Sequence, residues 1–321
     1  MKKRTGISIF VIVILMIIAT SCKKHSVPTL NTLPVLYISE QSVTCEGNIT
    51  DDGGAEITER GICWNTSGSP TTASNKIACG SGTGNYTGTI DGLSTNCQHY
   101  IRAYAINKAG TGYGPEIRFR TWNTDKVTDI DGNVYHTVTI GTQVWMVENL
   151  KVTHYRNGEA IANITDNVQW EGLTTGAYRD YNNNAANSIT YGRLYNWFSV
   201  DDSRNIAPDG WHVPGDADWT LLGNYLDGEA VAGGKMKEAG LAHWNEPNTG
   251  ATNETGFTGL PAGHCDYAGI FSYIKLGAGW WTSTAENPND AWIRYLDYGA
   301  ADIWRYLEDK RYGRSVRCVK D

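Results

Sequence analysis

The residues of this 321-residue chain that could bind a metal ion are few and scattered. Asp129, Asp131 and Asn133 alternate along the segment DIDGN, and oxygen atoms at that spacing are ligands that Ca²⁺ accepts. The segment lacks the third spaced acid and the distal Glu that complete a calcium loop, whereas an Asp-Gly-Asn hairpin turn explains the same residues without a metal. The pattern therefore favours a turn, and we expect no metal site.

Catalytic motifs are equally hard to find. The chain contains no G-x-S-x-G, no phosphate-binding Gly-rich loop and no H-E-x-x-H. Its seven His residues are scattered, and His212, which follows Trp211, is expected to be a hydrogen-bonded structural residue. Pairs of Asp and Glu could still meet in space as they do in glycoside hydrolases, so a polysaccharide-acting enzyme is the alternative. We expect no catalytic residue and no cofactor.

The overall charge argues against nucleic acid as a partner. Lys and Arg number 27 against 34 Asp and Glu, for a net charge of −7. Residues 1–21, which we expect to be removed, contain three basic and no acidic residues, so their loss takes the charge from −7 to −10. An acidic chain without a basic stripe repels phosphate backbones. The 40% hydrophobic content also excludes disorder over the whole chain.

The N-terminus carries an export signal. Basic residues in Met1–Arg4 precede the uncharged apolar run Ile7–Ala19, which is shorter than the about 20 residues that a spanning helix needs. The following ATSC, ending at Cys22, resembles a bacterial lipobox with Ala where Leu is more usual. We predict a lipoprotein signal peptide at 1–21, a lipid on Cys22, a tether at 22–33 and anchoring in the cell envelope, at the outer membrane or cell surface. A plain signal peptide is the alternative.

Six further cysteines remain, and an even number in an exported chain predicts disulfides. They are Cys45, Cys63, Cys79, Cys97, Cys265 and Cys318. Three pairings are open to the first four, among them Cys45–Cys97 with Cys63–Cys79, and buried free thiols are the alternative. No CxxC and no Cys/His cluster of zinc-finger spacing occurs, so no structural zinc is expected.

Residues 34–121 read as an all-β domain. Short β-prone runs at 42–49, 57–65, 85–90, 100–106 and 114–120 alternate with turn signals, and no helical periodicity interrupts them. About seven short strands in this length predict an immunoglobulin-like β-sandwich.

The segments GNITDDGGAEITERGICW and GLSTNCQHYIRAYAINKAGTGYGPEIRFRT resemble the fibronectin type III-like modules of Bacteroidota surface proteins. Such modules place a buried tyrosine at one corner, where this chain has His99, and an imidazole can also donate a hydrogen bond. The resemblance implies a spacer that holds the next domain away from the membrane.

Residues 125–321 hold ten of the 12 Trp and 13 of the 18 Tyr. Helices are predicted at 191–200 and 214–226, the latter with Gly215 as N-cap and Asp216 and Asp218 near its positive end. Strands are predicted on both sides of these helices, at 134–140, 144–150, 280–283, 291–298, 302–307 and 315–319. Two helices among many strands predict an α+β domain, with most of the Trp in its core.

The ordered segments DIDGNVYHTVTIGTQVWMVENLK, YGRLYNWF, DGWHVPGDADWTLL, GWWTSTAENPNDAWIRYL and RSVRCVKD resemble the Fibrobacter succinogenes major paralogous domain. The resemblance implies exported, often lipid-anchored proteins of largely undefined role. The pattern also resembles the C-type lectin-like fold shared with formylglycine-generating enzymes. Those enzymes hold copper with two closely spaced cysteines, which Cys265 and Cys318 are not. Ala207 stands where the family commonly has Cys, which leaves Cys265 as the candidate partner of Cys318.

Two segments are candidates for ligand binding. Glu246-Pro247-Asn248 resembles the triplet with which C-type lectins hold calcium and sugar, but the partner Trp-Asn-Asp is absent and a turn is favoured. Trp280 and Trp281 point to opposite faces if they lie on a strand, so at most one is expected in the main core, and the other is a candidate surface platform or packs against a loop. Glu246, Asn248, Trp280 and Trp281 are thus the candidate ligand contacts, although a turn is favoured for the first two.

These observations predict a lipid-anchored envelope protein. A β-sandwich spacer would present a non-catalytic binding or adhesion domain whose ligand is a glycan or a protein. The alternatives are an enzyme acting on polysaccharide and a purely structural surface component.

Overall fold

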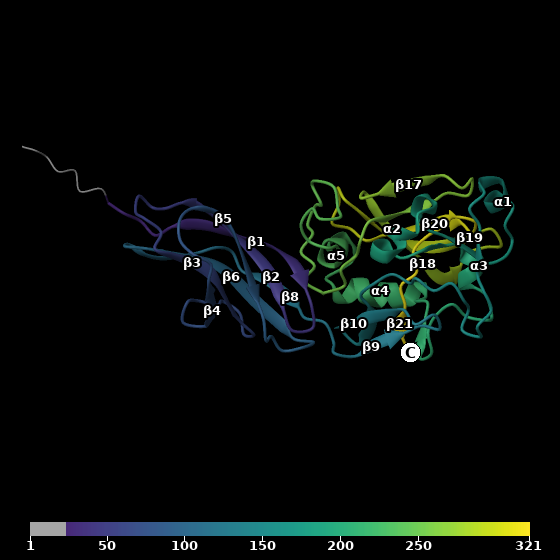
Figure 1. Cartoon of the computed structure of the whole chain (residues 1–321), viewed down its shortest axis with the longest axis horizontal. Coiled ribbons are helices and arrows are strands. Elements are labelled where there is room, and N and C mark those ends of the chain that lie inside the picture. The colour runs from purple at the N-terminus through teal and green to yellow at the C-terminus, as the bar shows by residue number, and fades with distance from the viewer. Residues whose placement is uncertain (1–23) are drawn as a thin grey trace, which may run out of the picture.

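The computed structural model describes residues 24–321, so the predicted signal peptide and the lipid on Cys22 lie outside the described residues. Figure 1 shows two bodies along the long axis of the molecule, a β-sandwich formed by the earlier part of the chain and a mixed domain formed by the later part. Within residues 24–321, no helix has the length and apolar character needed to cross a bilayer.

The first body is a sandwich of two antiparallel sheets. One has the order β1-β2-β5, and the other has the order β4-β3-β6-β7 with β8 also paired to β6. Along β2, buried and more exposed residues alternate with the period of two that a half-buried strand requires. This arrangement of three strands on five is the fibronectin type III-like module that the sequence predicted. The strands are β1 Thr29–Ile38, β2 Val43–Asp51, β3 Glu59–Asn65, β4 Asn75–Ala78, β5 Gly84–Ile90, β6 Gln98–Asn107, β7 Gly110–Tyr113 and β8 Ile117–Arg120.

The start of the sandwich differs from the expectation. The predicted tether at 22–33 is wrong in its second part, because β1 begins at Thr29 and Leu30 is buried in the core. At the corner where such modules usually have tyrosine, His99 is buried and its Nε2 lies 3.2 Å from the carbonyl oxygen of Ser94. The imidazole thus supplies the local hydrogen bond of the missing phenol.

The second body is built on three sheets. Their orders are β15-β21-β11-β10-β9, β12-β13-β14 and β17-β16-β18-β19-β20. The C-terminal strand β21 pairs with both β11 and β15, which ties the end of the chain to the start of the domain. The strands are β9 Lys126–Thr128, β10 Val134–Ile140, β11 Gln143–Met146, β12 Ala162–Asn163, β13 Ala177–Arg179, β14 Leu194–Tyr195, β15 Trp211–His212, β16 Ala262–Cys265, β17 Phe271–Ile274, β18 Gly277–Ala285, β19 Asp290–Asp297, β20 Trp304–Asp309 and β21 Val319–Lys320.

Short helices cover parts of these sheets, and their positions correct one expectation and confirm another. The helices are α1 Asn167–Glu171, α2 Ala185–Tyr191, α3 Trp197–Val200, α4 Asp216–Tyr225 and α5 Glu229–Met236, with the 3₁₀ turn η1 at Tyr181–Asn183. The single helix predicted at 191–200 is wrong, because Gly192 at φ 76° ends α2 and Asn196 caps a separate α3. Gly215 is the N-cap of α4, as the sequence predicted.

Helix α5 was missed because its two consecutive glycines argue against a helix. A Cβ on Gly233 would lie 2.0 Å from the carbonyl oxygen of Asp302, and one on Gly234 would lie 2.4 Å from that of Gly250. Both positions are glycine because other main-chain segments pass directly against the helix. Packing therefore explains residues that local propensity made unfavourable.

The disulfide prediction is contradicted within residues 24–321, where every cysteine is a free thiol. Cys265 is buried and receives a hydrogen bond from Nη1 of Arg179 at 3.3 Å, while Cys318 is buried in an apolar cluster. Burial raises the pKa of Cys265 to about 11, which favours the protonated thiol. Four of the six cysteines are buried and two are partly exposed, and none of them forms a cross-link within the described residues.

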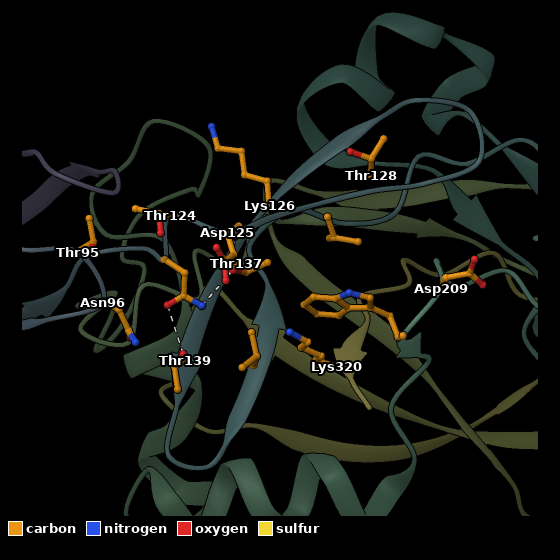
Figure 2. Close-up of a pocket in the computed structure, with 15 residues that line it drawn as sticks. Thr95, Asn96, Thr124, Asp125, Lys126, Thr128, Thr137, Thr139, Asp209 and Lys320 are labelled. Atoms are coloured by element: carbon orange, nitrogen blue, oxygen red, sulfur yellow. Dashed lines mark hydrogen bonds between the residues drawn. The ribbon is translucent and has the colours of Figure 1, made fainter.

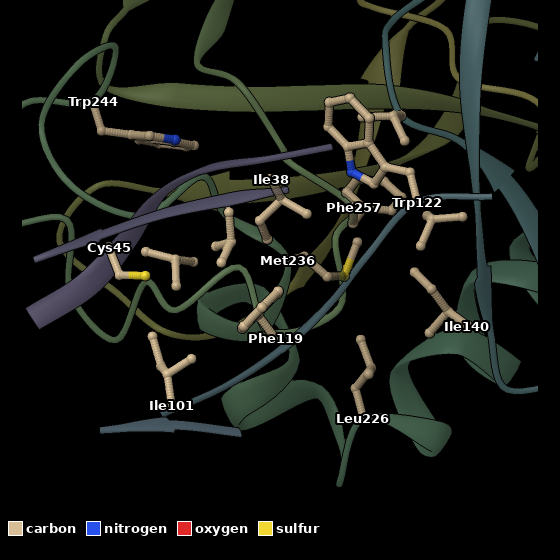
Figure 3. Packing of buried hydrophobic residues seen from close by; sticks show 14 of the residues in the cluster. Ile38, Cys45, Ile101, Phe119, Trp122, Ile140, Leu226, Met236, Trp244 and Phe257 are labelled. Carbon is tan, nitrogen blue, oxygen red and sulfur yellow. The ribbon is translucent and has the colours of Figure 1, made fainter. Parts of the chain in front are cut away.

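The two bodies are packed against each other instead of being joined by a free linker. Trp122 is buried at their junction, and its Nε1 donates to the carbonyl oxygen of Gly256 at 3.1 Å. Figure 3 shows this ring near Phe257 of the second body, in an apolar cluster that also contains Ile38 and Phe119 of the sandwich. The β-sandwich is therefore docked on the second body.

Candidate functional site

The sheet β17-β16-β18-β19-β20 carries an open cleft lined mainly by aromatic side chains. Tyr295 of β19 lies opposite Trp304 of β20, and Ile293 lies opposite Tyr306. Because side chains alternate between the faces of a strand, these four share one face of the sheet. The cleft has a volume of about 370 Å³, and we call it the aromatic cleft. It is lined by His264, Tyr273, Ile293, Tyr295, Asp297, Trp304, Tyr306, Glu308, Tyr312 and Arg314.

The rings form two walls. On one side, Tyr295 and Trp304 are nearly parallel, with an interplanar angle of 12° and centroids 6.1 Å apart, and Tyr306 stands across Trp304 at 62°. On the other side, Tyr273 stacks on His264 with centroids 5.3 Å apart. Tyr273 is 52% exposed and Tyr306 is 46% exposed. Large aromatic faces are thus open to solvent next to buried ones.

Two glycines of β18 make room for the buried part of the cleft. A Cβ on Gly277 would lie 2.1 Å from the hydroxyl of Tyr295, and one on Gly279 would lie 2.7 Å from Nη1 of Arg314. Both distances are shorter than any ordinary carbon contact. The absence of side chains at these positions therefore lets Tyr295 and Arg314 lie against the strand.

A buried ion pair lies at the base of the cleft. Nε of Arg314 donates to Glu308 at 2.6 Å, and Nη2 donates to the second oxygen of the same carboxylate. The guanidinium also lies 5.8 Å from the ring centroid of Tyr295 and 5.9 Å from that of Tyr312, within the range of a cation–π contact. Its Nη1 has no hydrogen-bond partner among residues 24–321. This pair fixes the rings and neutralises both charges.

His264 lies beside this pair and stays uncharged. Burial, together with the positive charge of Arg314, lowers the pKa of His264 to about 3. An imidazole with that pKa is a poor general base near neutral pH. His264 therefore contributes a flat, neutral ring to the wall of the cleft.

Asp297 is the remaining charged group of the cleft. Its Oδ1 accepts a hydrogen bond from the amide of Gly299 at 2.8 Å, and its Oδ2 lies 3.4 Å from the hydroxyl of Tyr295. Among residues 24–321, no group of three or more His, Cys, Asp or Glu residues is placed to hold a metal ion. The cleft thus offers stacking surfaces, hydroxyl groups and one carboxylate with a free acceptor position.

The predicted calcium triplet does not form a site of this kind. Glu246 is exposed, whereas Asn248 is buried and its side-chain amide donates to the carbonyl oxygens of Glu238 and Gly240 at 2.9 and 2.8 Å. Of the two candidate ligands, Glu246 is therefore exposed to solvent, whereas Asn248 stabilises a turn.

The predicted tryptophan platform is wrong. Trp280 and Trp281 do point to opposite faces of β18, but both are fully buried. Trp280 donates to Oδ1 of Asn149 at 2.8 Å and packs near Trp219, while Trp281 donates to the carbonyl oxygen of Tyr195 at 2.8 Å. Both faces of the sheet are covered at β18, so neither ring is exposed to stack on a ligand.

The exposed aromatic residues lie two strands away, on β20. Trp304 is half-buried and, with Tyr306 and Glu308, follows the period of two along that strand. The same period aligns Ile293, Tyr295 and Asp297 on β19. Both strands were predicted, but their pairing was not, and only the pairing places these residues in one cleft.

A larger groove lies at the junction of the two bodies, and it is a weaker candidate. It has a volume of about 820 Å³, and Figure 2 shows short polar side chains along it. Many of these are already hydrogen-bonded within the protein: Asn123 donates to Oγ1 of Thr137 at 3.0 Å, and Thr139 donates back to Asn123 at 3.3 Å. Trp211 is the only aromatic residue that lines the groove, which therefore offers little stacking surface for a ligand.

The comparison with family models bears on the second body. The family model described as the Fibrobacter succinogenes major domain matches residues 138–320. Among curated proteins, none matches the chain.

Solved structures match about a third of the chain at low identity. The sensor domain of the anti-sigma factor RsgI4 from Pseudobacteroides cellulosolvens is 13% identical, with 30% of this chain and 95% of that chain covered and a TM-score of 0.24. The FN1–FN3 domains of chicken CNTN1 are 18% identical, with 30% and 32% covered and a TM-score of 0.25. A human FNIII domain is 20% identical, with 33% and 86% covered and a TM-score of 0.24. The sheet topology, rather than these scores, identifies the sandwich.

Proposed function

The chain belongs to the Fibrobacter succinogenes major domain family, and from that premise we propose that it is a lipid-anchored envelope protein whose second domain binds a glycan in the aromatic cleft without turning it over. The observation that carries this proposal is the set of aromatic rings above a fixed base, with Tyr273 and Tyr306 exposed and Trp304 half-buried. Aromatic faces of this size stack on the apolar faces of sugar rings, and hydroxyl groups at the rim match sugar hydroxyls.

A binding role is favoured over a catalytic one by the charges in the cleft. Glu308 is engaged on both oxygens by Arg314, and His264 is neutral with a pKa of about 3. A glycoside hydrolase needs one carboxyl group as acid and a second as nucleophile or base. Only Asp297 is free for such a role among the residues that line the cleft, so the cleft lacks the second carboxyl group that hydrolysis needs.

The anchoring part of the proposal rests on the N-terminal sequence. The lipobox-like ATSC ending at Cys22 favours attachment to the membrane through lipid, and several acyl chains would make that attachment effectively permanent. The docked sandwich would then hold the aromatic cleft at a fixed distance and orientation from the membrane. Replacing Cys22 by Ala should release the protein into the soluble fraction of labelled cells, and continued membrane attachment would contradict the anchor.

We also propose that the second domain is a C-type lectin-like fold. The pairing of the C-terminal strand β21 with β11, near the start of the domain, supports this, as does α4 packed beneath the sheet that contains β18 and β19. The proposal concerns ancestry and fold, and the glycan site in the aromatic cleft does not depend on it.

Calorimetric titration against a panel of oligosaccharides tests the function. The full-length protein in detergent should bind at least one of them, and Trp304→Ala should weaken that binding at least tenfold. The matched control is Trp292→Ala, because Trp292 is also half-buried and lies on the same sheet but outside the cleft. An equal loss of affinity in both variants would refute the aromatic cleft as the binding site. Formation of a hydrolysis product would show that the function is hydrolysis rather than binding alone. Addition of calcium should leave the affinity unchanged.

A further inference from the structure

The charges of the aromatic cleft do not cancel. Two carboxylates, Asp297 and Glu308, and one guanidinium, Arg314, line it, and His264 is neutral. Since Arg314 and Glu308 neutralise each other, the cleft carries one net negative charge, on Asp297.

The carboxylate of Asp297 is available to a ligand. Within residues 24–321 it forms no ion pair, and its Oδ2 has only a long 3.4 Å contact, with the hydroxyl of Tyr295. The nearby ammonium of Lys237 donates to the main-chain oxygen of Asp297 at 2.9 Å, and two further carbonyl oxygens engage it. No side chain of the protein therefore occupies the free acceptor position of Asp297.

Resting on the glycan-binding function proposed above, we propose that the aromatic cleft selects a basic amino sugar, whose protonated amine pairs with Asp297 while its ring stacks on Trp304 and Tyr306. A cation beside open aromatic faces gains from both the carboxylate and the ring quadrupoles. The sugar class is thus set by charge and the general glycan affinity by the rings.

The same geometry disfavours acidic sugars. The guanidinium of Arg314 is 4% exposed and holds Glu308 with two of its nitrogens, while the third lies against Gly279. No cation is left to receive a uronate or a sulfate, and such a ligand would face Asp297 directly. Repulsion of acidic sugars by Asp297 therefore adds to the selectivity that its attraction for amino sugars provides.

A lysine side chain would fit the charge but not the polar rim. The hydroxyls of Tyr273 and Tyr306 and the indole nitrogen of Trp304 make no hydrogen bond within residues 24–321. Sugar hydroxyls can pair with these groups, whereas the alkyl stem of a lysine would leave them unmatched. The cleft is consequently better matched by a sugar than by a basic peptide.

The test compares three oligosaccharides of equal length with the full-length protein in detergent: a glucosamine oligomer, its N-acetylated counterpart and a uronic acid oligomer. Titrations at about pH 5.5 keep the sugar amines protonated. The glucosamine oligomer should bind about tenfold more tightly than the N-acetylated one, and the uronic acid oligomer should not bind measurably.

Asp297→Asn should remove this preference, bringing the two affinities within about twofold of each other while the N-acetylated oligomer binds as before. Asp209→Asn is the control, because that side chain is 93% exposed and lies outside the cleft. An intact preference in Asp297→Asn would overturn the assignment of the charge.

The remaining outcomes separate this inference from the function on which it rests. Equal affinity of the wild-type protein for the amine and the N-acetylated oligomer overturns the amino-sugar inference and leaves glycan binding standing. Tightest binding of the uronate overturns it as well, and so does tetralysine that binds as tightly as the glucosamine oligomer. If neither this trio nor the wider oligosaccharide panel binds, the proposed function itself fails.

Discussion

The two faces of the sheet formed by β18, β19 and β20 carry similar residues but differ in their exposure to solvent. On one face, Trp280 is fully buried near α4, and the buried Arg294 is held by Asp216 and Glu229. On the other face, Arg314 is held by Glu308, yet the neighbouring Trp304 and Tyr306 remain open to solvent. Aromatic rings and arginine–carboxylate pairs thus build a core where a helix covers them and an open cleft on the uncovered face.

The largest expected effect comes from removing one tryptophan from each face. Trp280→Ala should lower the free energy of unfolding by about 3–5 kcal/mol, because it leaves a cavity in a packed core. Trp304→Ala should cost at most about 1.5 kcal/mol, since the ring is half-buried. Urea denaturation of both variants measures the difference. Similar losses would show that the cleft face is part of the core after all.

Gly277, one of the two glycines of β18 that make room for the buried part of the cleft, offers the next test. Gly277→Ala should destabilise the protein by about 1–3 kcal/mol, because the new Cβ would displace the Tyr295 ring, and it should also weaken glycan binding. Thermal denaturation and calorimetry measure the two effects. Gly172→Ala is the control, since its nearest contacts are 3.7 Å away. A Gly277 variant as stable as this control would mean that the ring moves aside freely.

Lowering the pH should destabilise the protein through Asp216, on the face of the sheet that α4 covers. Burial would raise the pKa of Asp216, but the hydrogen bonds and charges of Arg305 and Arg294 outweigh it and lower the pKa. The stabilisation is therefore present above the ordinary Asp pKa of about 3.9 and is lost as the pH falls through the lowered folded-state value. Denaturation between about pH 6 and 2 should show a smaller pH-dependent loss in Asp216→Asn than in the wild type. An unchanged pH profile would exclude Asp216 as a contributor.

The smallest expected effect concerns a single hydroxyl of the open face. Tyr306→Phe should leave stability within about 0.5 kcal/mol of the wild type, because the side chain is largely solvated. It should weaken glycan binding about two- to fivefold by removing one hydrogen bond. Tyr225→Phe, at a residue that is 57% exposed outside the cleft, is the calorimetric control. No change in affinity would restrict the role of Tyr306 to stacking.

Much of the fold was predictable because it depends on local patterns. The alternation along β2 and β6 and the turn residues between them indicated the sandwich. Gly215 and Asp218 marked the start of α4, where the carboxylate of Asp218 accepts from the amide of Gly215 at 2.8 Å. These features involve residues within a few positions of each other, so the sequence displays them directly.

The candidate site was less predictable because its parts meet across strands. Trp280 and Trp281 are adjacent in the sequence and conspicuous, yet distant segments bury both rings. Tyr295 and Trp304 are inconspicuous, yet the register of β19 and β20 sets them side by side. Burial and pairing are long-range properties, and a periodic pattern shows only that a strand has two faces, not which face is covered.

The sequence by itself determined the family, the β-rich first domain and the order of most strands, because motif order and short-range periodicity survive without knowledge of contacts. Only the tertiary structure decided that the cysteines among residues 24–321 form no disulfide, that Trp122 docks the two bodies together and that the aromatic cleft lies on β19 and β20. The physical reason is that side-chain exposure depends on which remote segments pack over each face, and local propensity does not encode that packing.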